Sequence, residues 1–317
     1  MNGPEIVPIA LPTPFRVGPV NVFLVKSTPL TLIDAGVNTG EAFEALRAAF
    51  KREALALSDL EVVLLTHTHI DHVGLLGRLR ACADFTVYAH PDATHHRLNL
   101  EDNHDEAHRF ALEIMREFGT PPDVIEKASA EQQTFRDYAA DAAVDRGADE
   151  GQTVGPYTVC HVPGHSARDI LFVNPRQRAA FTGDHVLATM TPNPLLRRPS
   201  PGQPRTRSLV QYRNSLRKTH ALDLDVCYPG HGDPIRDHRA VIDSLFKRMD
   251  SRSARILALL GRQPLSVYEV ARGLFPRADV TQMYLQLSAA VGHLELLEEE
   301  GRVAPQYRDG VLCFRTV

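Results

Sequence analysis

The chain has 317 residues, which is long enough to bury a large core and to form two domains. Its hydrophobic share of 43% and charged share of 23% are ordinary for a soluble globular protein. The formal net charge of −4 excludes a general electrostatic attraction to nucleic acid or to an anionic membrane. We therefore expect neither of these as a partner.

The cysteines and the N-terminus indicate where the protein works. Cys82, Cys160, Cys227 and Cys313 lie far apart and form no CxxC pair, so we expect free thiols in a reducing compartment. The N-terminus lacks the basic and apolar regions of a signal peptide, and no apolar run approaches the length of a membrane span. These features predict a cytoplasmic protein.

The first third of the chain is predicted to alternate strands with a helix. A helical face runs from Phe43 to Phe50, and Asn38 with Glu41 is predicted to form the capping box that starts this helix. The strands are predicted at five short apolar runs, which are Ile6–Ala10, Val20–Val25, Leu30–Asp34, Val62–Leu65 and Phe85–Ala89.

Residues 66–72, Thr66-His67-Thr68-His69-Ile70-Asp71-His72, follow the fourth of these strands. Imidazole nitrogen and carboxylate oxygen both suit Zn²⁺ and related divalent metals. His67 and His69 are two residues apart, so in extended backbone they point the same way. Asp71 and His72 can turn toward a second metal position. The alternative is a histidine-rich surface loop in a chain with 15 histidines, but the preceding strand and the downstream partners favour a metal site.

Three later residues complete a pattern that resembles the metallo-β-lactamase superfamily. They are His165 in Pro163–Ser166, Asp184 in Phe181–Asp184 and His231 in Tyr228–Gly232. Each follows a short apolar run, at Tyr157–Val162, Ala179–Phe181 and Asp225–Tyr228. With His67-x-His69-x-Asp71-His72, the set resembles the seven-ligand dinuclear site of glyoxalase II and related hydrolases. The resemblance covers roughly residues 5–245.

This resemblance implies an α/β protein with the αββα metallo-β-lactamase sandwich. It implies a first metal held by His67, His69 and His165, and a second held by Asp71, His72 and His231. Asp184 would bridge the two cations, and a hydroxide shared between them would attack the substrate. We assign the catalytic role to Asp71 and Asp184. Two divalent ions are expected, zinc first, with iron and manganese left open because mixed nitrogen and oxygen ligands do not discriminate.

Asp34 ends an apolar strand and has two interpretations. It is a turn residue, or it is a buried carboxylate that braces the histidine loop through hydrogen bonds without touching metal, as the resemblance implies.

Residues 92–150 contain no convincing strand and are predicted to be a helical insertion, interpreted as a lid or a substrate-facing excursion. Apolar residues follow helical spacing at 110–115 and at 124–128, with Pro121-Pro122 between them, and a third, polar helix is predicted over Ala130–Ala143. We interpret four histidines of this insertion as exposed helix residues and not as further ligands, namely His95, His96, His104 and His108.

A proline-rich loop at 191–205 follows Asp184 and is expected to border the site. Within it, Arg197 and Arg198 either meet an anionic part of the substrate or form a solvated basic pair. A helix spanning Leu209 to Leu222 is then predicted to lead back to the strand before His231.

Residues 246–317 resemble a small winged-helix domain that follows a hydrolase domain at 1–245. Three helices are predicted, the second starting at a Ser266–Glu269 capping box, and an Asp309-Gly310 turn is predicted to join two strands. Winged helices often bind DNA, but residues 250–317 hold eight basic and eight acidic residues, and the third helix ends in Glu298-Glu299-Glu300. This balance argues against a role in following phosphates. Packing, homodimer formation or shaping of the site edge fits it better.

These features predict a metal-dependent hydrolase of a small-molecule ester, thioester or lactone, such as a thioesterase or lactonase. A metal-dependent endoribonuclease of the same fold is the alternative, and a non-catalytic metal-bound scaffold is a third. The acidic balance and the absence of a long basic tract favour the small-molecule hydrolase. The fold and the metal ligands alone do not fix the substrate.

Overall fold

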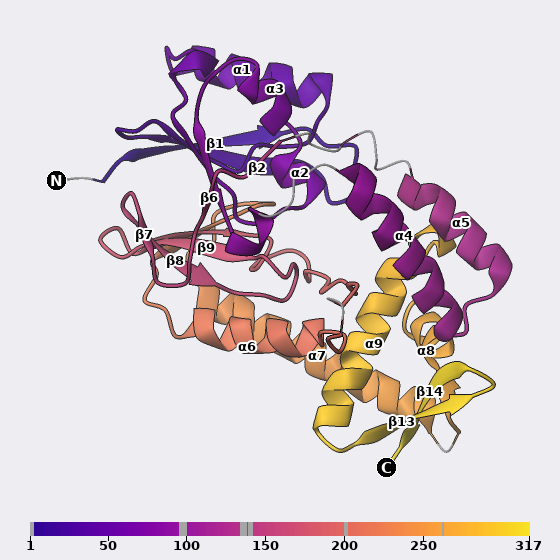
Figure 1. The fold of residues 1–317 in the computed structure, drawn as a ribbon. Helices are drawn as coiled ribbons and strands as arrows, with labels where there is room; N and C mark the ends of the chain where they lie inside the picture. The colour runs from indigo at the N-terminus through magenta and orange to yellow at the C-terminus, as the bar shows by residue number, and fades with distance from the viewer. Residues whose placement is uncertain (1–2, 95–99, 134–137, 139–141, 200–201, 262) are drawn as a thin grey trace. The chain divides into compact units, whose positions relative to one another are not determined.

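The computed structural model describes residues 3–94, 100–133, 138, 142–199, 202–261 and 263–317 (Figure 1). The chain divides into two compact units. Unit 1 comprises Met1–Leu100, Asp137–Pro192 and Ser215–Val241, and unit 2 comprises Glu101–Arg136, Asn193–Asn214 and Ile242–Val317.

Unit 1 contains two β-sheets. The first has the strand order β1-β2-β3-β4-β5-β6, antiparallel from β1 to β3 and parallel from β3 to β6. Its strands are β1 (Glu5–Leu11), β2 (Val20–Lys26), β3 (Thr31–Ile33), β4 (Val62–Leu64), β5 (Thr86–Ala89) and β6 (Arg146–Gly147). The five strands predicted in this part of the sequence are confirmed to within a few residues, because each is an apolar run between turn residues. The prediction of no strand in residues 92–150 is wrong, because the two-residue β6 pairs with β5 although it has no apolar run of its own.

The second sheet of unit 1 has the order β11-β10-β9-β8-β7. Its strands are β7 (Thr153–Val154), β8 (Tyr157–His161), β9 (Ile170–Asn174), β10 (Ala179–Gly183) and β11 (Val226–Pro229). The apolar runs predicted before His165, Asp184 and His231 are β8, β10 and β11. Strand β9, which pairs with both β8 and β10, was missed by the sequence analysis.

The two sheets of unit 1 face each other across an apolar layer. Phe23 of β2 packs against Phe181 of β10, with ring centroids 5.2 Å apart. Ile33 and Leu64 belong to the same buried cluster, as does Phe172 of β9. Apolar side chains on both facing surfaces are what hold two stacked sheets together. The predicted sandwich is therefore confirmed.

Helices cover the outer faces of these sheets. The helices α1 (Gly40–Arg52) and α3 (Leu76–Arg80) lie over the first sheet, and the part of α6 (Ser208–His220) that belongs to unit 1 lies beneath β8 and β9 (Figure 1). The short α2 (Ile70–Val73) and the 3₁₀ turns η1 (Leu57–Asp59) and η2 (Pro91–Ala93) lie in connections of unit 1.

The predicted capping box of α1 is wrong in register. Thr39 is the N-cap, and its Oγ1 accepts a hydrogen bond from the N–H of Ala42 over 3.1 Å. A threonine hydroxyl one residue nearer the helix makes this bond, so Asn38 and Glu41 are not the capping pair.

Unit 2 is mainly helical. It contains α4 (Leu100–Glu117), α5 (Pro122–Gln133), most of α7 (His238–Leu260), α8 (Val267–Leu274), η4 (Val280–Gln282) and α9 (Met283–Glu299). A three-stranded sheet of order β12-β14-β13 completes it, with β12 (Leu265–Ser266), β13 (Val303–Arg308) and β14 (Val311–Thr316). The winged-helix resemblance stays a prediction.

Two local predictions in unit 2 are confirmed. Ser266 Oγ accepts from the N–H of Glu269 over 3.1 Å, and Glu269 Oε2 accepts from the N–H of Ser266 over 2.7 Å, which is a complete capping box. Asp309 and Gly310 have φ values of 49° and 79° and join β13 to β14 as a two-residue hairpin turn.

The core of unit 2 draws on three separate stretches of sequence. One buried cluster contains Ile114 of α4, Phe118 directly after α4, Ile125 of α5, Val291 of α9, and Leu196 from the segment before α6. Helices α4 and α5, predicted as an insertion, thus share a core with the C-terminal helices. Part of the predicted helix at Ala130–Ala143 lies outside the described residues. His95 and His96 lie outside them entirely.

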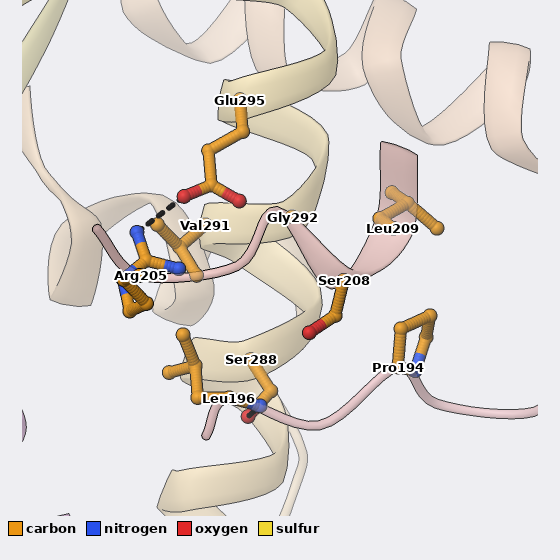
Figure 2. Close-up of a pocket in the computed structure, with 9 residues that line it drawn as sticks. All are labelled: Pro194, Leu196, Arg205, Ser208, Leu209, Ser288, Val291, Gly292 and Glu295. Carbon is orange, nitrogen blue, oxygen red and sulfur yellow. Dashed lines mark hydrogen bonds and ion pairs between the residues drawn. The ribbon is translucent and has the colours of Figure 1, made fainter. Parts of the chain in front are cut away.

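Described residues on both sides of 200–201 in segment 193–214 of unit 2 pack closely on α9. Figure 2 shows Arg205 directed at the Glu295 carboxylate, with which it forms an ion pair. It also shows Gly292 facing Leu209, and a Cβ at this glycine would lie 2.9 Å from Leu209 Cβ. The absence of a side chain at Gly292 therefore allows the two segments to approach.

Helix α7 runs unbroken through residues 245 and 246, where the sequence analysis placed a domain boundary. The domain boundary predicted there stays a prediction. All four cysteines are free thiols, and all but Cys82 are buried. Among the described residues, no helix combines the length and apolarity needed to span a bilayer.

Candidate metal centre

The seven predicted ligands of unit 1 come together where strands of both sheets end. Residues 66–72 follow β4 and enter α2, and His165 lies four residues beyond β8. Asp184 directly follows β10, and His231 lies two residues beyond β11. The described residues contain three groups with metal-binding geometry, and they are His67–His69–His165, His67–His72–Asp184 and Asp71–His72–His231.

Three imidazoles form the first cluster. Nδ1 of His69 lies 3.0 Å from Nε2 of His67 and 2.9 Å from Nε2 of His165. On the far side of its ring, Nδ1 of His67 lies 3.1 Å from Oγ1 of Thr66. That contact assigns the proton of His67 to Nδ1 and leaves the Nε2 lone pair facing the other two rings.

The second cluster joins Asp71, His72 and His231. Nε2 of His231 lies 3.4 Å from Oδ2 of Asp71, and Nε2 of His72 lies 4.0 Å from Oδ1 of the same residue. Nδ1 of His231 donates to the backbone oxygen of Pro19 over 2.7 Å. Both Nε2 atoms therefore face the cluster, in the orientation that a metal-binding histidine needs.

Asp184 lies between the two clusters. Its Oδ1 is 3.5 Å from Nε2 of His72, while its Oδ2 is 3.6 Å from Nε2 of His231 and 3.7 Å from Nε2 of His165. One carboxylate thus faces histidines of both predicted metal positions.

Asp34 braces the histidine loop, as one of its two interpretations required. Its Oδ1 accepts from the N–H of Thr66 over 2.8 Å, and its Oδ2 accepts from the Thr66 hydroxyl over 2.7 Å and from Nδ1 of His72 over 2.8 Å. Because Thr66 in turn accepts from His67, this buried carboxylate supports one ring of each cluster. Its φ of 58° gives the turn that brings it there.

Burial and neighbouring charges shift the pKa values of these histidines in opposite directions. Burial, together with the adjacent imidazole of His165, lowers the pKa of His69 to about 3, and burial with the other histidines lowers the pKa of His67. Burial also acts to lower the pKa of His72, but the Asp34, Asp71 and Asp184 carboxylates outweigh it and raise that pKa well above its usual value.

The remaining shifts follow the same logic. Burial acts to lower the pKa of His231, but the neighbouring carboxylates of Asp71 and Asp184 raise it. Burial acts to raise the pKa values of Asp71 and Asp184, but the His72 charge and the other histidines lower both. His67 and His69 of the first cluster are therefore neutral imidazoles, whereas in the second cluster the buried carboxylates raise the pKa values of His72 and His231.

Three buried polar atoms at the centre have no hydrogen-bond partner among the described residues. They are Nε2 of His72, Nε2 of His231 and Oδ1 of Asp184. Buried polar atoms are normally satisfied, and leaving three together would be costly unless another group satisfies them. The nitrogen and oxygen donors are those preferred by zinc and related divalent metals, so the residues fit such ions.

Two glycines allow the ligand loops to approach each other. A Cβ at Gly230 would lie 2.4 Å from Oδ1 of Asp184, and one at Gly183 would lie 2.4 Å from Oγ1 of Thr66. Sequence reasoning assigned no role to these glycines, to Thr66 or to Asn21, which contacts the His231 loop. The signal for Asn21 was a polar residue within the apolar run 20–25.

Other candidate side chains lie outside these groups. His108 is half-buried and not exposed as predicted, and its Nε2 lies 3.3 Å from Oγ of Ser129 in α5. It joins none of the metal-binding groups found among the described residues. The side chain of His104 lies outside the described part. Arg198 forms an ion pair with the half-exposed Glu106 over 2.5 Å, and a role for Arg197 and Arg198 toward substrate stays a prediction.

A family model for the metallo-beta-lactamase superfamily matches residues 15–231, which include all seven clustered side chains. The chain belongs to the metallo-beta-lactamase superfamily. It is 32% identical to "Probable metallo-hydrolase YqjP" of Bacillus subtilis over 323 residues, covering 100% of this chain and 99% of that protein. It is 26% identical to an "Atrochrysone carboxyl ACP thioesterase" of Emericella nidulans over 296 residues, covering 92% and 78% of the two chains.

A solved superfamily structure is similar over nearly the whole chain. The metallo-beta-lactamase family protein TTHA1429 of Thermus thermophilus has a TM-score of 0.81 and 25% identity, covering 98% of each chain. The likeness therefore includes the residues of both units.

Proposed function

We propose that this metal-dependent hydrolase of the metallo-beta-lactamase superfamily holds two divalent cations and cleaves a small-molecule ester, thioester or lactone. One observation in particular supports the binding of two metal ions. Three buried atoms without a hydrogen-bond partner among the described residues, Nε2 of His72, Nε2 of His231 and Oδ1 of Asp184, face one centre beside three converging imidazoles.

His67, His69 and His165 would hold the first cation, and Asp71, His72 and His231 the second. Asp184 would contribute to both positions, which its two oxygens support because they face histidines of both clusters. When bound, such ions supply a Lewis acid for the substrate oxygen and water acidified toward neutral pH. Zinc is the metal we propose first.

The protein's own residues prepare the site for that chemistry. Asp34 orients His72 directly and His67 through Thr66, and Pro19 orients His231. Asp71 and Asp184 supply the negative charge that offsets two dications, and both carboxylates are buried. Fixed orientation matters because ligands held in place need no reorganisation when substrate arrives.

Two observations support an acyl substrate over a polyanion. One similar protein carries the name of an acyl-carrier-protein thioesterase. The formal net charge of −4 provides no general attraction for RNA. We therefore propose a small-molecule partner for this site.

Metal titration tests the dinuclear part of the proposal. Metal-free protein titrated with Zn²⁺, with elemental analysis of the product, should approach two ions per chain, and His231→Ala should lower that value toward one. A value near one for the unaltered protein, unchanged by His231→Ala, would contradict the second metal position.

A further inference from the structure

We infer that Asn21 is the positioning residue for the His231 loop, and that it thereby controls occupancy of the second metal position. This inference rests on the proposed dinuclear site. Asn21 is the second residue of β2 in the first sheet, whereas His231 follows β11 in the second sheet. Both belong to unit 1.

The hydrogen bonds of Asn21 reach both sides of His231. Its Nδ2 donates to the backbone oxygen of Pro229 over 3.1 Å and to that of Gly232 over 2.7 Å. Its backbone N–H donates to the oxygen of Gly230 over 2.7 Å. With the bond from His231 to Pro19, each residue from 229 to 232 is tied to the start of β2.

The position of this loop has little tolerance. Gly230 donates its N–H to the oxygen of Gly183 over 2.8 Å, which links the His231 loop to the turn that carries Asp184. The space beside Gly230 is closed, because a Cβ there would lie 2.4 Å from Asp184 Oδ1 and 2.6 Å from His72 Cε1. Because no space is free on the side of Asp184 and His72, a loop released from β2 could move only away from them. Such a movement would take His231 away from Asp71.

The chemistry of an amide suits this position. Asn21 meets two carbonyl oxygens with one side-chain nitrogen, and only an NH₂ group supplies two donors from a single short side chain. Aspartate has the same size but no donor, and its charge would face the same two carbonyl oxygens. Asn21→Asp thus removes the donors without removing the volume.

The bonds that support the first cluster come from other residues. His67 is supported by Thr66 and Asp34, and His165 lies in the loop after β8. Loss of the Asn21 amide should therefore weaken the second metal position selectively. A residue with a purely structural role would weaken both positions together or neither.

The test titrates metal-free Asn21→Asp, Asn21→Ala and unaltered protein with Zn²⁺ by calorimetry. Asn174→Ala is the matched control. Asn174 also bonds to backbone, through the N–H groups of Arg176 and Gln177, but it ends β9 opposite Ala179, at the other end of β10 from Asp184. We expect both Asn21 variants to keep the first binding event and to lose about tenfold or more in affinity at the second. Asn21→Gln, which keeps the donors on a longer side chain, should recover part of that loss.

The possible results distinguish failure of the Asn21 role from failure of the dinuclear site. Two binding events in the unaltered protein, with the second unchanged in folded Asn21→Asp, would overturn the role of Asn21 and leave the dinuclear site intact. Equal weakening of both events would also overturn it. A single event in the unaltered protein would instead contradict the dinuclear site itself. Circular dichroism of each metal-free variant identifies those that fold. If Asn21→Ala does not fold, the titration of Asn21→Asp decides the question.

Discussion

Nδ1 of His72 donates a hydrogen bond over 2.8 Å to Oδ2 of Asp34, a residue 38 positions earlier in the chain. Both side chains are buried, and the bond joins the turn after β3 to α2. It fixes the ring so that Nε2 faces Asp71 and Asp184. Carboxylates behind metal-binding histidines commonly have this role.

Asp34→Asn should fold and bind metal more weakly. Asparagine tolerates the φ of 58° at this position and can still accept from the Thr66 N–H, but its amide group cannot accept both from the Thr66 hydroxyl and from His72 as Oδ2 does. We expect the metal affinity to fall by about 10–100-fold. Competition for zinc with a chromophoric chelator measures this affinity. An unchanged affinity in a folded variant would show that Asp34 does not support metal binding.

Gly230→Ala should displace the Asp184 carboxylate, because the new Cβ would lie 2.4 Å from its Oδ1. We expect metal content to fall by half or more. Gly40→Ala is the control, since a Cβ there meets nothing within 4 Å, and it should retain full metal content. Elemental analysis compares them. Full metal content in Gly230→Ala would show that the ligand loops can separate without losing the ions.

His293 should make the stability of unit 2 depend on pH. Burial, with smaller effects of Arg252 and Arg213, lowers the pKa of this side chain to about 3. A histidine whose folded pKa lies below its unfolded value contributes stability that is present above about pH 6.5 and is lost as the pH falls toward the folded value. Its share of the free energy of unfolding should fall by up to about 1.4 kcal/mol per pH unit in that range.

Denaturant unfolding of the unaltered protein and of His293→Gln at a series of pH values measures this contribution. The difference between the two should shrink as the pH falls from 6.5, because the variant has no buried imidazole to protonate. If the free energies of unfolding of the two proteins differ by the same amount at every pH, His293 does not titrate as its environment implies.

The C-terminal region should not bind duplex DNA. Helix α9 is the third helix of the predicted winged helix, and nearby cations pair with its carboxylates, Arg205 with Glu295 and Arg207 with Glu298. A fluorescent duplex titrated with the full chain at low salt should show no tight change in anisotropy. Nanomolar binding that weakens steeply with added salt would contradict this expectation.

The strands that precede the predicted ligand loops could be found from the sequence because their signals are local. The strands before His67, His165, Asp184 and His231 are short apolar runs that end at polar residues, and sheet geometry then gathers those ends at one edge. The interpretation of Asp34 as a brace came from the family resemblance and is confirmed by its bonds to Thr66 and His72.

The features that could not be predicted depend on contacts between distant segments. Asn21 is an ordinary strand residue until its amide meets the oxygen of Gly232, which lies 211 positions later. Strand β9 was missed, although Ile170–Asn174 is largely apolar, and it becomes obvious only as the partner of β8 and β10. Likewise, helical spacing at 110–128 predicts an apolar face but not that α8 and α9 cover it.

We propose that the protein is a metal-dependent acyl hydrolase in which Asp184 would serve both metal positions. The most direct test of this proposal compares metal-loaded protein with Asp184→Asn in parallel assays of thioester, aryl ester, lactone and RNA cleavage. Asparagine keeps the size but removes the charge that offsets two dications, so metal content and turnover should both fall, the latter by at least about 100-fold. We expect acyl hydrolysis that exceeds RNA cleavage and disappears in Asp184→Asn. RNA cleavage lost in Asp184→Asn, with no metal-dependent acyl hydrolysis in the unaltered protein, would contradict it.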